Sequence, residues 1–255
     1  MRLFYREEGS GYPIIILHGL YGASDNWLPI AHLLSPFFRV ILPDLRNHGH
    51  SPHHPEHTYT ALADDVAGLI DTLRLSVKPH LVGHSMGGKV AMLLALNDPA
   101  LTARNIILDI APKSYSLSEE HQRLFHFLHT ANLHQFSSYE TLRQHLALHF
   151  PSIREQQIIL KNITRKQEHF HWRINAKALL HAKEDLLSWQ ETEKRYTEEI
   201  LFIKGGDSPY IPDSEILKKN FPAALLSNIP ETGHWLHTEQ PEKLTEMILS
   251  YLNQA

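Results

Sequence analysis

The feature that most constrains this chain is the motif Gly83-His84-Ser85-Met86-Gly87, which fits the pattern G-x-S-x-G. An apolar run precedes the motif from residue 80, and an apolar, helix-forming stretch follows it to about residue 96. This order predicts a tight turn between a strand and a helix, where the two glycines let strand and helix approach closely. We therefore predict that Ser85 stands at the carboxyl edge of a sheet as a catalytic nucleophile.

The rest of the chain supplies partners in the order that such a serine requires. Five-residue glycine patterns also occur in strand-turn-helix units without a catalytic role, so the context decides. A nucleophilic serine needs a base, a carboxylate that fixes the tautomer of the base, and N–H donors for the oxyanion. His234, in a Gly-His loop near the C-terminus, is the predicted base. Asp109 and Asp207 each follow a predicted strand and are both candidates for the acid, and the backbone N–H groups of Leu20 and Met86 are candidates for the oxyanion hole.

The order of the predicted elements is that of an α/β protein. Short continuous apolar runs suit strands that are buried on both faces of a parallel sheet. These runs are residues 12–17, 37–42, 80–83, 104–110 and 200–204. From residue 113 to 190 the alternation of strand and helix stops, helical stretches predominate, and only residues 170–174 suggest an extended segment. We predict a mostly parallel sheet flanked by helices, formed by residues 1–112 and 191–255, with a mainly helical cap inserted at residues 113–190.

The N-terminal segment gives two further expectations. Weak alternation at residues 3–6 and the turn at residues 9–11 predict a hairpin that pairs the first segment with residues 12–17. The first ten residues carry four charges, and the first apolar run is too short for a signal-peptide core or a membrane span. We therefore expect a cytoplasmic protein without a membrane partner.

Composition excludes several classes of function. A net charge of −4 and a pI near 6.6 give no basic field for nucleic acid or for anionic lipid. The absence of cysteine excludes disulfides, thiolate metal sites and a cysteine nucleophile. Five of the 20 histidines crowd into one proline-broken loop, at positions 48, 50, 53, 54 and 57. Because no carboxylate or cysteine stands there at a fixed ligand spacing, we expect a solvated loop rather than a metal site, and we predict no cofactor.

Several motifs together resemble one family over the whole chain. They are His18-Gly19-Leu20-Tyr21-Gly22, Asp44 to Gly49, Gly83 to Lys89, Asp109-Ile110-Ala111-Pro112, Trp172 to Asn175, and Gly233-His234-Trp235. With these the chain resembles the α/β-hydrolase superfamily, and within it the bacterial acyl-CoA esterase group related to the mitochondrial abhydrolase-domain proteins. The resemblance implies an α/β-hydrolase fold and a serine esterase or thioesterase for short acyl chains, with Ser85 and His234 in the catalytic triad.

The resemblance also bears on the acid and on the substrate contacts. Superfamily precedent favours the later strand and Asp207, but the group that this chain resembles often carries Asn there and shares the motif at Asp109. We therefore predict Asp109 as the acid, with Asp207 as the alternative. The loop of His18 and Gly19 is expected to contact substrate. Arg173 is a candidate for holding an anionic substrate group such as a CoA phosphate, and its alternative role is a salt bridge within the cap.

Lys89 and the cap raise two further expectations. Lys89 lies in the first turn of the helix after the motif, where a cation opposes the helix dipole, so we expect it to point to a buried carboxylate or to solvent. As the resemblance implies, the cap at residues 113–190 is expected to form an apolar acyl pocket that restricts substrates to short chains, although the sequence does not determine the exact chain length.

Two other functions remain open on the same fold. A carbon-carbon bond hydrolase or lyase for acidic keto substrates would need arginines that converge in the pocket, and the cap offers five without evident convergence. These are Arg123, Arg143, Arg154, Arg165 and Arg173. A receptor that binds a small ligand without turnover is the alternative from another class, because one fold serves many functions. The sequence leaves the oligomeric state undetermined.

Overall fold

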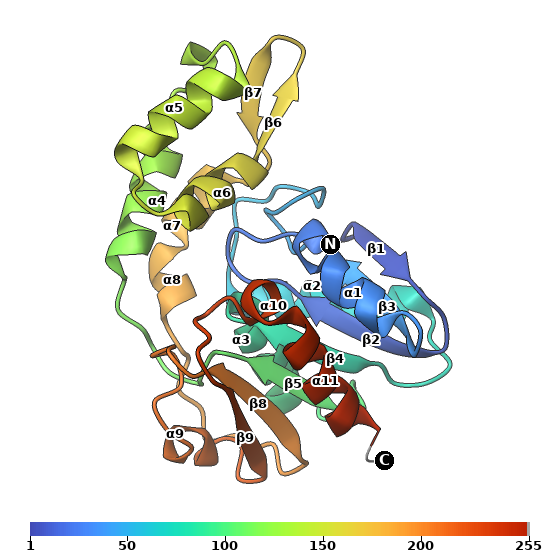
Figure 1. Ribbon diagram of the computed structural model, residues 1–255. Coiled ribbons are helices and arrows are strands. Elements are labelled where there is room, and N and C mark those ends of the chain that lie inside the picture. Colours follow the sequence, from blue (N-terminus) through green and yellow to red (C-terminus); the bar gives the residue numbers. More distant parts are fainter. Residues whose placement is uncertain (254–255) are drawn as a thin grey trace.

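Seven strands form the main sheet of the computed structural model, which describes residues 1–253 (Figure 1). The strands lie in the order β1-β3-β2-β4-β5-β8-β9, and each neighbouring pair except β1 and β3 runs parallel. Their bounds are β1 Tyr5–Glu8, β2 Tyr12–Leu17, β3 Phe38–Pro43, β4 His80–His84, β5 Asn105–Leu108, β8 Ile200–Gly205 and β9 Ala224–Ile229. Because β4 and β5 are parallel neighbours, Ser85 and Asp109 follow strands that end side by side.

The central strands are apolar throughout because both faces of the sheet are covered. In β2, Ile15 and Leu17 pack into one hydrophobic cluster, whereas Ile14 and Ile16 pack into the cluster on the opposite face. Each of these four side chains is at most 1% exposed. A strand buried on both faces has no polar positions to alternate with, which is why the continuous apolar runs predicted these strands correctly.

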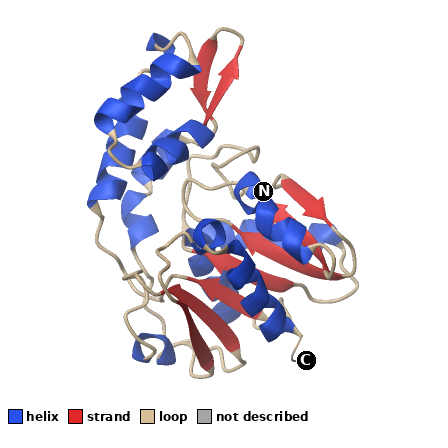
Figure 2. Ribbon diagram, viewed as in Figure 1, coloured by secondary structure: helices blue, strands red, loops and turns tan. Residues whose placement is uncertain are grey.

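Helices cover the two faces in pairs. The helices α1 (Leu28–Leu34) and α11 (Pro241–Leu252) contribute to one cluster, and α2 (Tyr59–Leu73) and α3 (Met86–Asn97) contribute to the other (Figure 2). The start of α2 is fixed locally, because the Thr58 side chain accepts a hydrogen bond from the N–H of Ala61. Three further short helical segments lie in the α/β part of the chain, outside residues 113–190. They are η1 Ser24–Trp27, α9 Glu215–Lys218 and α10 Leu236–Glu239.

Residues 113–190 lie outside the sheet, beside its carboxyl edge (Figure 1). The elements there are α4 Glu119–Thr130, η2 Leu133–Gln135, α5 Tyr139–His149, α6 Ile153–Lys161, β6 Ile163–Lys166, β7 His169–Trp172, α7 Ala176–His181 and α8 Lys183–Leu187. The segment is mainly helical, but β6 and β7 form an antiparallel hairpin where the sequence suggested one extended stretch. Helix α4 packs by its apolar stripe, and Phe127 meets Phe150 edge-on at 5.2 Å between ring centroids.

The first strand differs from the prediction. Strand β1 pairs antiparallel with β3, not with β2, so the predicted hairpin with residues 12–17 is wrong. Both edges of β2 are occupied by parallel partners, β3 and β4, which leaves β1 the outer edge of β3. A side-chain pair across this junction joins Arg39 Nε to Glu7 Oε1 at 2.8 Å. Across residues 1–253, no helix combines the length and the apolar character that crossing a bilayer requires.

Candidate active site

The turn between β4 and α3 is as tight as the motif predicted. Ser85 has φ 52° and ψ −115°, a conformation that non-glycine residues rarely adopt. A Cβ added at Gly83 would lie 2.3 Å from the carbonyl oxygen of Gly87, and one at Gly87 would lie 2.5 Å from that of Leu17. Side chains at these positions would force strand and helix apart. The close packing therefore holds the strained serine at the end of β4, and its N–H donates to the carbonyl oxygen of Leu108 at 3.1 Å.

The loop after β2 packs directly against this turn. A Cβ added at Gly19 would lie 2.9 Å from His84 Nδ1 and 3.2 Å from the Cβ of Ser85, so the absence of a side chain permits this close approach. Leu20 and Met86 line the same small hollow as Ser85. Met86 begins α3, and the first N–H groups of a helix have no partner within the helix. The two backbone N–H groups proposed for an oxyanion hole thus lie on the two segments that meet at Ser85.

Asp109 and His234 are brought together in the interior. Asp109 Oδ2 lies 2.7 Å from His234 Nδ1, and Asp109 is 0% exposed. The same carboxylate accepts a hydrogen bond from the N–H of Gly205 at 3.0 Å and another from the hydroxyl of Ser208. A carboxylate with these donors stays fixed, and it selects the imidazole tautomer that carries its proton on Nδ1.

Asp207, the alternative acid, lies elsewhere. Its side chain is exposed, and its backbone N–H donates to the carbonyl oxygen of Thr232 at 3.0 Å. The neighbouring Ser208 instead turns inward to Asp109, a contact that no sequence motif indicated. Of the two candidate carboxylates, the structure brings only Asp109 to His234.

His234 is held from several sides. Its ring stacks on that of Tyr210, with centroids 4.1 Å apart and planes 19° apart. His84 Nε2 donates to the backbone carbonyl oxygen of His234 at 2.8 Å, a contact that no sequence motif indicated. Burial, followed by the nearby His234 and His237, holds the pKa of His84 well below its ordinary value. A neutral His84 can therefore donate from Nε2 and fix the loop that carries His234.

Two small hollows surround the serine. One, of about 10 Å³, is lined by both Ser85 and His234. The other, of about 50 Å³, extends from Ser85 toward the cap segment and is lined mainly by aromatic and aliphatic side chains. These are Tyr59, Ile110, Tyr115, Phe125, Leu186, Leu187 and Tyr210. Within residues 1–253 no hydrogen bond joins the Ser85 hydroxyl to His234, and such bonds commonly tighten only when substrate is bound.

The side chain of His18 does not contact the hollows, which corrects the expectation that it touches substrate. His18 is 1% exposed; its Nε2 accepts from the N–H of Leu45 at 2.9 Å, and its Nδ1 donates to the carbonyl oxygen of Gly19 at 2.8 Å. Burial lowers the pKa of His18, in keeping with a neutral ring. Gly19 does line the smaller hollow. His18 therefore shapes the loop, and Gly19 and Leu20 present it to the site.

Arg173 joins the cap to the core. Its Nη1 lies 3.0 Å from Asp25 Oδ2 and donates to the carbonyl oxygen of Lys161 at 3.0 Å. The expected salt bridge exists, but its carboxylate belongs to the core and not to the cap. Because Arg173 lines neither hollow and is already paired, the structure does not favour its role in holding an anionic substrate group.

The other cap arginines do not converge on Ser85. Arg123 pairs with Glu155 at 2.9 Å, Arg154 with Glu120 at 3.0 Å and Arg165 with Glu168 at 3.6 Å. None of the five lines either hollow at the serine. A site for an acidic keto substrate thus lacks the arginines that it would need.

The histidine-rich loop is less solvated than expected. His48 and His57 are buried, and burial lowers the pKa of His57 to about 4. His48 Nε2 accepts from the N–H of Tyr21, and Asn47 Nδ2 lies 3.2 Å from His57 Nδ1, so the inward-facing part of the loop supports the site. In the described part of the chain, no group of three or more His, Cys, Asp or Glu side chains could hold a metal ion.

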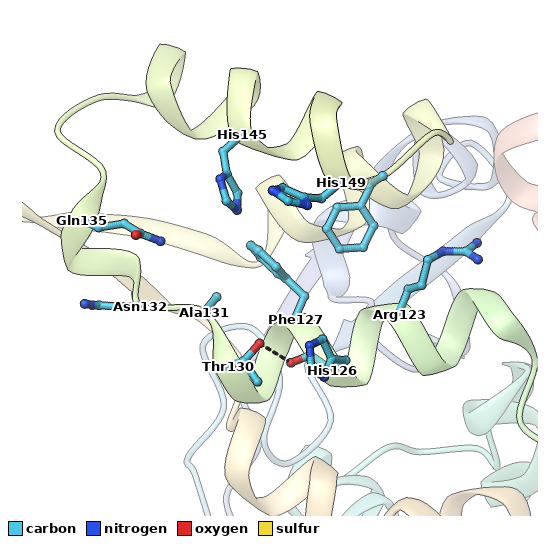
Figure 3. Close-up of a pocket in the computed structure, with 10 residues that line it drawn as sticks. Arg123, His126, Phe127, Thr130, Ala131, Asn132, Gln135, His145 and His149 are labelled. Carbon is cyan, nitrogen blue, oxygen red and sulfur yellow. Dashed lines mark hydrogen bonds between the residues drawn. The ribbon is translucent and has the colours of Figure 1, made fainter.

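A larger cavity lies within the cap, away from the serine. It has a volume of about 440 Å³, and all of its lining residues belong to segment 123–150. His145 and His149 point from α5 toward Phe127 on α4 (Figure 3). Its Arg123 is already paired with Glu155. Size alone therefore does not select this cavity over the candidate site formed by Ser85, His234 and Asp109.

Comparison with known proteins agrees with this geometry. The model of the alpha/beta hydrolase family matches residues 14–247. The sn-1-specific diacylglycerol lipase ABHD11 of Danio rerio is 31% identical over 256 residues, covering 96% of this chain and 80% of that protein. Esterase YbfF of Escherichia coli (strain K12) is 31% identical over 253 residues, covering 97% and 96%. The chain therefore belongs to the alpha/beta hydrolase family.

A solved structure supports the same assignment. A marine microorganism esterase matches with a TM-score of 0.93 and 35% sequence identity, covering 98% of this chain and 99% of that one. The α/β-hydrolase fold and the relation to abhydrolase-domain proteins, both expected from the sequence, are confirmed.

Proposed function

We propose that this chain is a serine hydrolase that cleaves short-chain acyl esters or acyl-CoA thioesters through an acyl-enzyme on Ser85. The observation that carries the proposal is the buried 2.7 Å contact between Asp109 Oδ2 and His234 Nδ1, formed beside a serine in strained backbone geometry. Nucleophile, acid and base then follow the chain order Ser85, Asp109, His234 that the fold uses for acyl transfer.

In the first half of the reaction, the Ser85 hydroxyl oxygen attacks the acyl carbonyl carbon. The hydroxyl proton passes to Nε2 of His234, because Nδ1 carries the hydrogen that is donated to Asp109. The carbonyl oxygen gains the negative charge, which the N–H groups of Leu20 and Met86 stabilise. When the bond from the carbonyl carbon to the alcohol or thiol breaks, the leaving group takes the proton from His234, and the acyl group remains on Ser85.

In the second half, water replaces the leaving group. His234 takes a proton from the water, whose oxygen attacks the acyl carbon, and the proton then returns to the serine oxygen as the acid product leaves. Asp109 remains ionised throughout and stabilises the imidazolium that forms twice in each cycle. No cofactor enters these steps.

The small hollow supports a short acyl group. About 50 Å³ beside Ser85, walled by Phe125, Leu186 and Leu187, gives an apolar acyl group a place to be buried. The names of two relatives, a diacylglycerol lipase and an esterase, suggest esters as the substrate class to test, with diacylglycerol among them. The thioester part of the proposal comes from the resemblance to acyl-CoA esterases.

A fluorophosphonate probe and a substrate series test the proposal. We expect the probe to label Ser85, and we expect the chain to hydrolyse p-nitrophenyl acetate and butyrate and the matching acyl-CoA thioesters. The Ser85→Ala variant is the matched control for both measurements. A folded protein that neither reacts with the probe nor hydrolyses any of these substrates would instead favour a ligand receptor.

A further inference from the structure

Lys89 is a buried cation close to the nucleophile. It lies one helical turn after Ser85, and its N–H donates to the carbonyl oxygen of Ser85 at 3.0 Å. It is 2% exposed, and no carboxylate within residues 1–253 lies within ion-pair distance of it. The expectation that Lys89 points to a buried carboxylate or to solvent is therefore wrong. A buried charge without a counter-ion needs another source of stabilisation.

Backbone carbonyl groups of the cap provide that stabilisation. Lys89 Nζ donates to Ser188 O at 2.6 Å, to Leu187 O at 3.3 Å and to Leu186 O at 3.4 Å. These residues form the C-terminal end of α8, where free carbonyl groups favour a cation. The rings of Tyr59 and Tyr115 lie 5.2 and 5.1 Å from the same nitrogen.

Segment 186–188, which Lys89 holds by these hydrogen bonds, also forms a wall of the hollow of about 50 Å³ beside Ser85. Leu186 and Leu187 line that hollow, and the carbonyl oxygen of Leu186 accepts a second hydrogen bond, from the Tyr59 hydroxyl at 2.9 Å. Lys89 and Tyr59 thus hold the wall from two neighbouring helices, α3 and α2.

A second, larger hollow lies beyond this wall. Its volume is about 610 Å³, and Lys89 and Tyr59 line both hollows. Its inner lining includes Leu93 and Leu96 of α3 and Trp189 of the segment that returns from the cap, whereas its outer side is open and lined by exposed polar side chains such as Asp185, Glu191 and Lys194. Lys89, Tyr59 and the segment they hold are thus a partition between about 50 Å³ at the nucleophile and about 610 Å³ behind it.

We infer that Lys89 is a specificity-determining residue, which limits the acyl chain by tethering segment 186–188 as the end wall of the acyl pocket. The inference rests on the proposed function. An aliphatic acyl group that is longer than the pocket meets the tethered wall, and the larger hollow is the space that such a chain would enter if the wall gave way. Burial lowers the pKa of Lys89 to about 7, so the bonds that hold the wall are made by an amine close to losing its charge.

The test compares chain-length profiles. We measure kcat/KM for p-nitrophenyl esters from C2 to C12 with wild type, Lys89→Ala and Lys89→Met. For Lys89→Ala we expect the ratio of C10 to C4 to rise by roughly tenfold or more, because accommodating even one further methylene in an apolar pocket changes kcat/KM by about this factor. Lys89→Met keeps the length of the side chain but loses the three hydrogen bonds, and we expect a smaller rise. Lys113→Ala is the control, because Lys113 Nζ also lies over the Tyr115 ring, at 5.0 Å, but makes no tether.

Two measurements keep the inference separate from stability and from the proposed function. Thermal unfolding shows whether the variants fold, and the binding of decan-2-one, a neutral ketone that is not hydrolysed, reports the pocket without turnover. If wild type hydrolyses no ester, the proposed function fails, but a Tm shift by decan-2-one in Lys89→Ala and not in wild type would still support the partition. Folded Lys89 variants that keep the wild-type chain-length ratio and the wild-type ketone binding would overturn the inference.

Discussion

His84 Nε2 and the backbone carbonyl oxygen of His234 lie 2.8 Å apart, so the residue before the proposed nucleophile holds the loop of the proposed base. In His84→Phe the Nε2 donor is lost, while an aromatic ring still occupies the position. We expect kcat to fall about 10²-fold, because small displacements of a catalytic group cost this much, with little change in KM. His80→Phe, at the other end of β4, is the control and should keep its rate. Equal rates in the two variants would show that the contact does not position His234.

Ser85→Ala removes the proposed nucleophile. We expect kcat for p-nitrophenyl butyrate to fall by roughly 10⁴-fold or more, because the remaining groups then act only on water. Far-ultraviolet circular dichroism should be unchanged, since alanine is smaller and the turn is held by Gly83 and Gly87. A variant with more than a tenth of the wild-type rate would refute the acyl-enzyme on this residue.

Asp109→Asn and Asp207→Asn separate the two candidate acids. The Asp109 variant should lose about 10⁴-fold in kcat, because an amide at this position selects the wrong imidazole tautomer. The Asp207 variant should stay within about twofold of wild type, since its exposed side chain contacts neither Asp109 nor His234 in the described part of the chain. Both are measured in the same ester assay. The reverse ranking would assign the acid to Asp207.

Acid should destabilise the protein steeply. Burial lowers the pKa of eight histidines. The pKa falls to about 4 for His57 and His80 and to about 3 for His237, and it is also lowered for His18, His48, His84, His121 and His145. Below the ordinary pKa of 6.5 the unfolded chain binds protons that the folded protein does not. The free energy of unfolding should therefore be highest above pH 6.5 and decrease as the pH falls toward 4.

Urea denaturation at pH 7, 6, 5 and 4.5 measures this dependence. His237→Phe is the informative variant, because the ring of His237 stacks on Trp27 at 4.3 Å and phenylalanine can keep that contact. Between pH 6 and 4.5 we expect its slope to be smaller than that of wild type by about 1.4 kcal/mol per pH unit, the contribution of one proton. An unchanged slope would mean that His237 is protonated in the folded state as easily as in the unfolded state.

The pair of Arg173 and Asp25 should contribute to stability rather than to substrate binding. Both side chains are partly exposed, so we expect a coupling energy of about 0.5 kcal/mol in a double-mutant cycle of Arg173→Ala and Asp25→Ala. KM should change equally for p-nitrophenyl butyrate and butyryl-CoA. If KM rises about tenfold for the CoA substrate alone, Arg173 binds its phosphate groups after all.

Much of the fold was predictable because its central strands are buried on both faces. A strand such as β2 carries no polar position in its buried part, and that pattern is visible in a single sequence. The pairing of β1 was not predictable in the same way. Its short sequence fits any free sheet edge, and only the assembled order of β3, β2 and β4 determines which edge remains.

In the candidate site too, features made by neighbouring residues were predictable, and features made by distant residues were not. Ser85 was predictable because the turn that exposes it is made by its immediate neighbours, Gly83 and Gly87. Asp109 and Asp207 could not be separated by their own surroundings in the sequence, because both follow adjacent strands. The donors that hold Asp109, from Gly205 and Ser208, come from almost one hundred residues away.

The position of the cap in the chain also makes the protein divisible. Segment 113–190 stands after Ser85 and Asp109 and before His234, and its hairpin turns at residues 167–168, far from the sheet. A chain cut at this turn yields an N-terminal fragment with the proposed nucleophile and acid and a C-terminal fragment with the proposed base. Under the proposed mechanism neither half completes an acyl transfer alone, so ester hydrolysis by a mixture of the two would report that they have reassembled. If two other proteins were fused to the two fragments, their association would bring the fragments together. Hydrolysis of a chromogenic ester would then report that association.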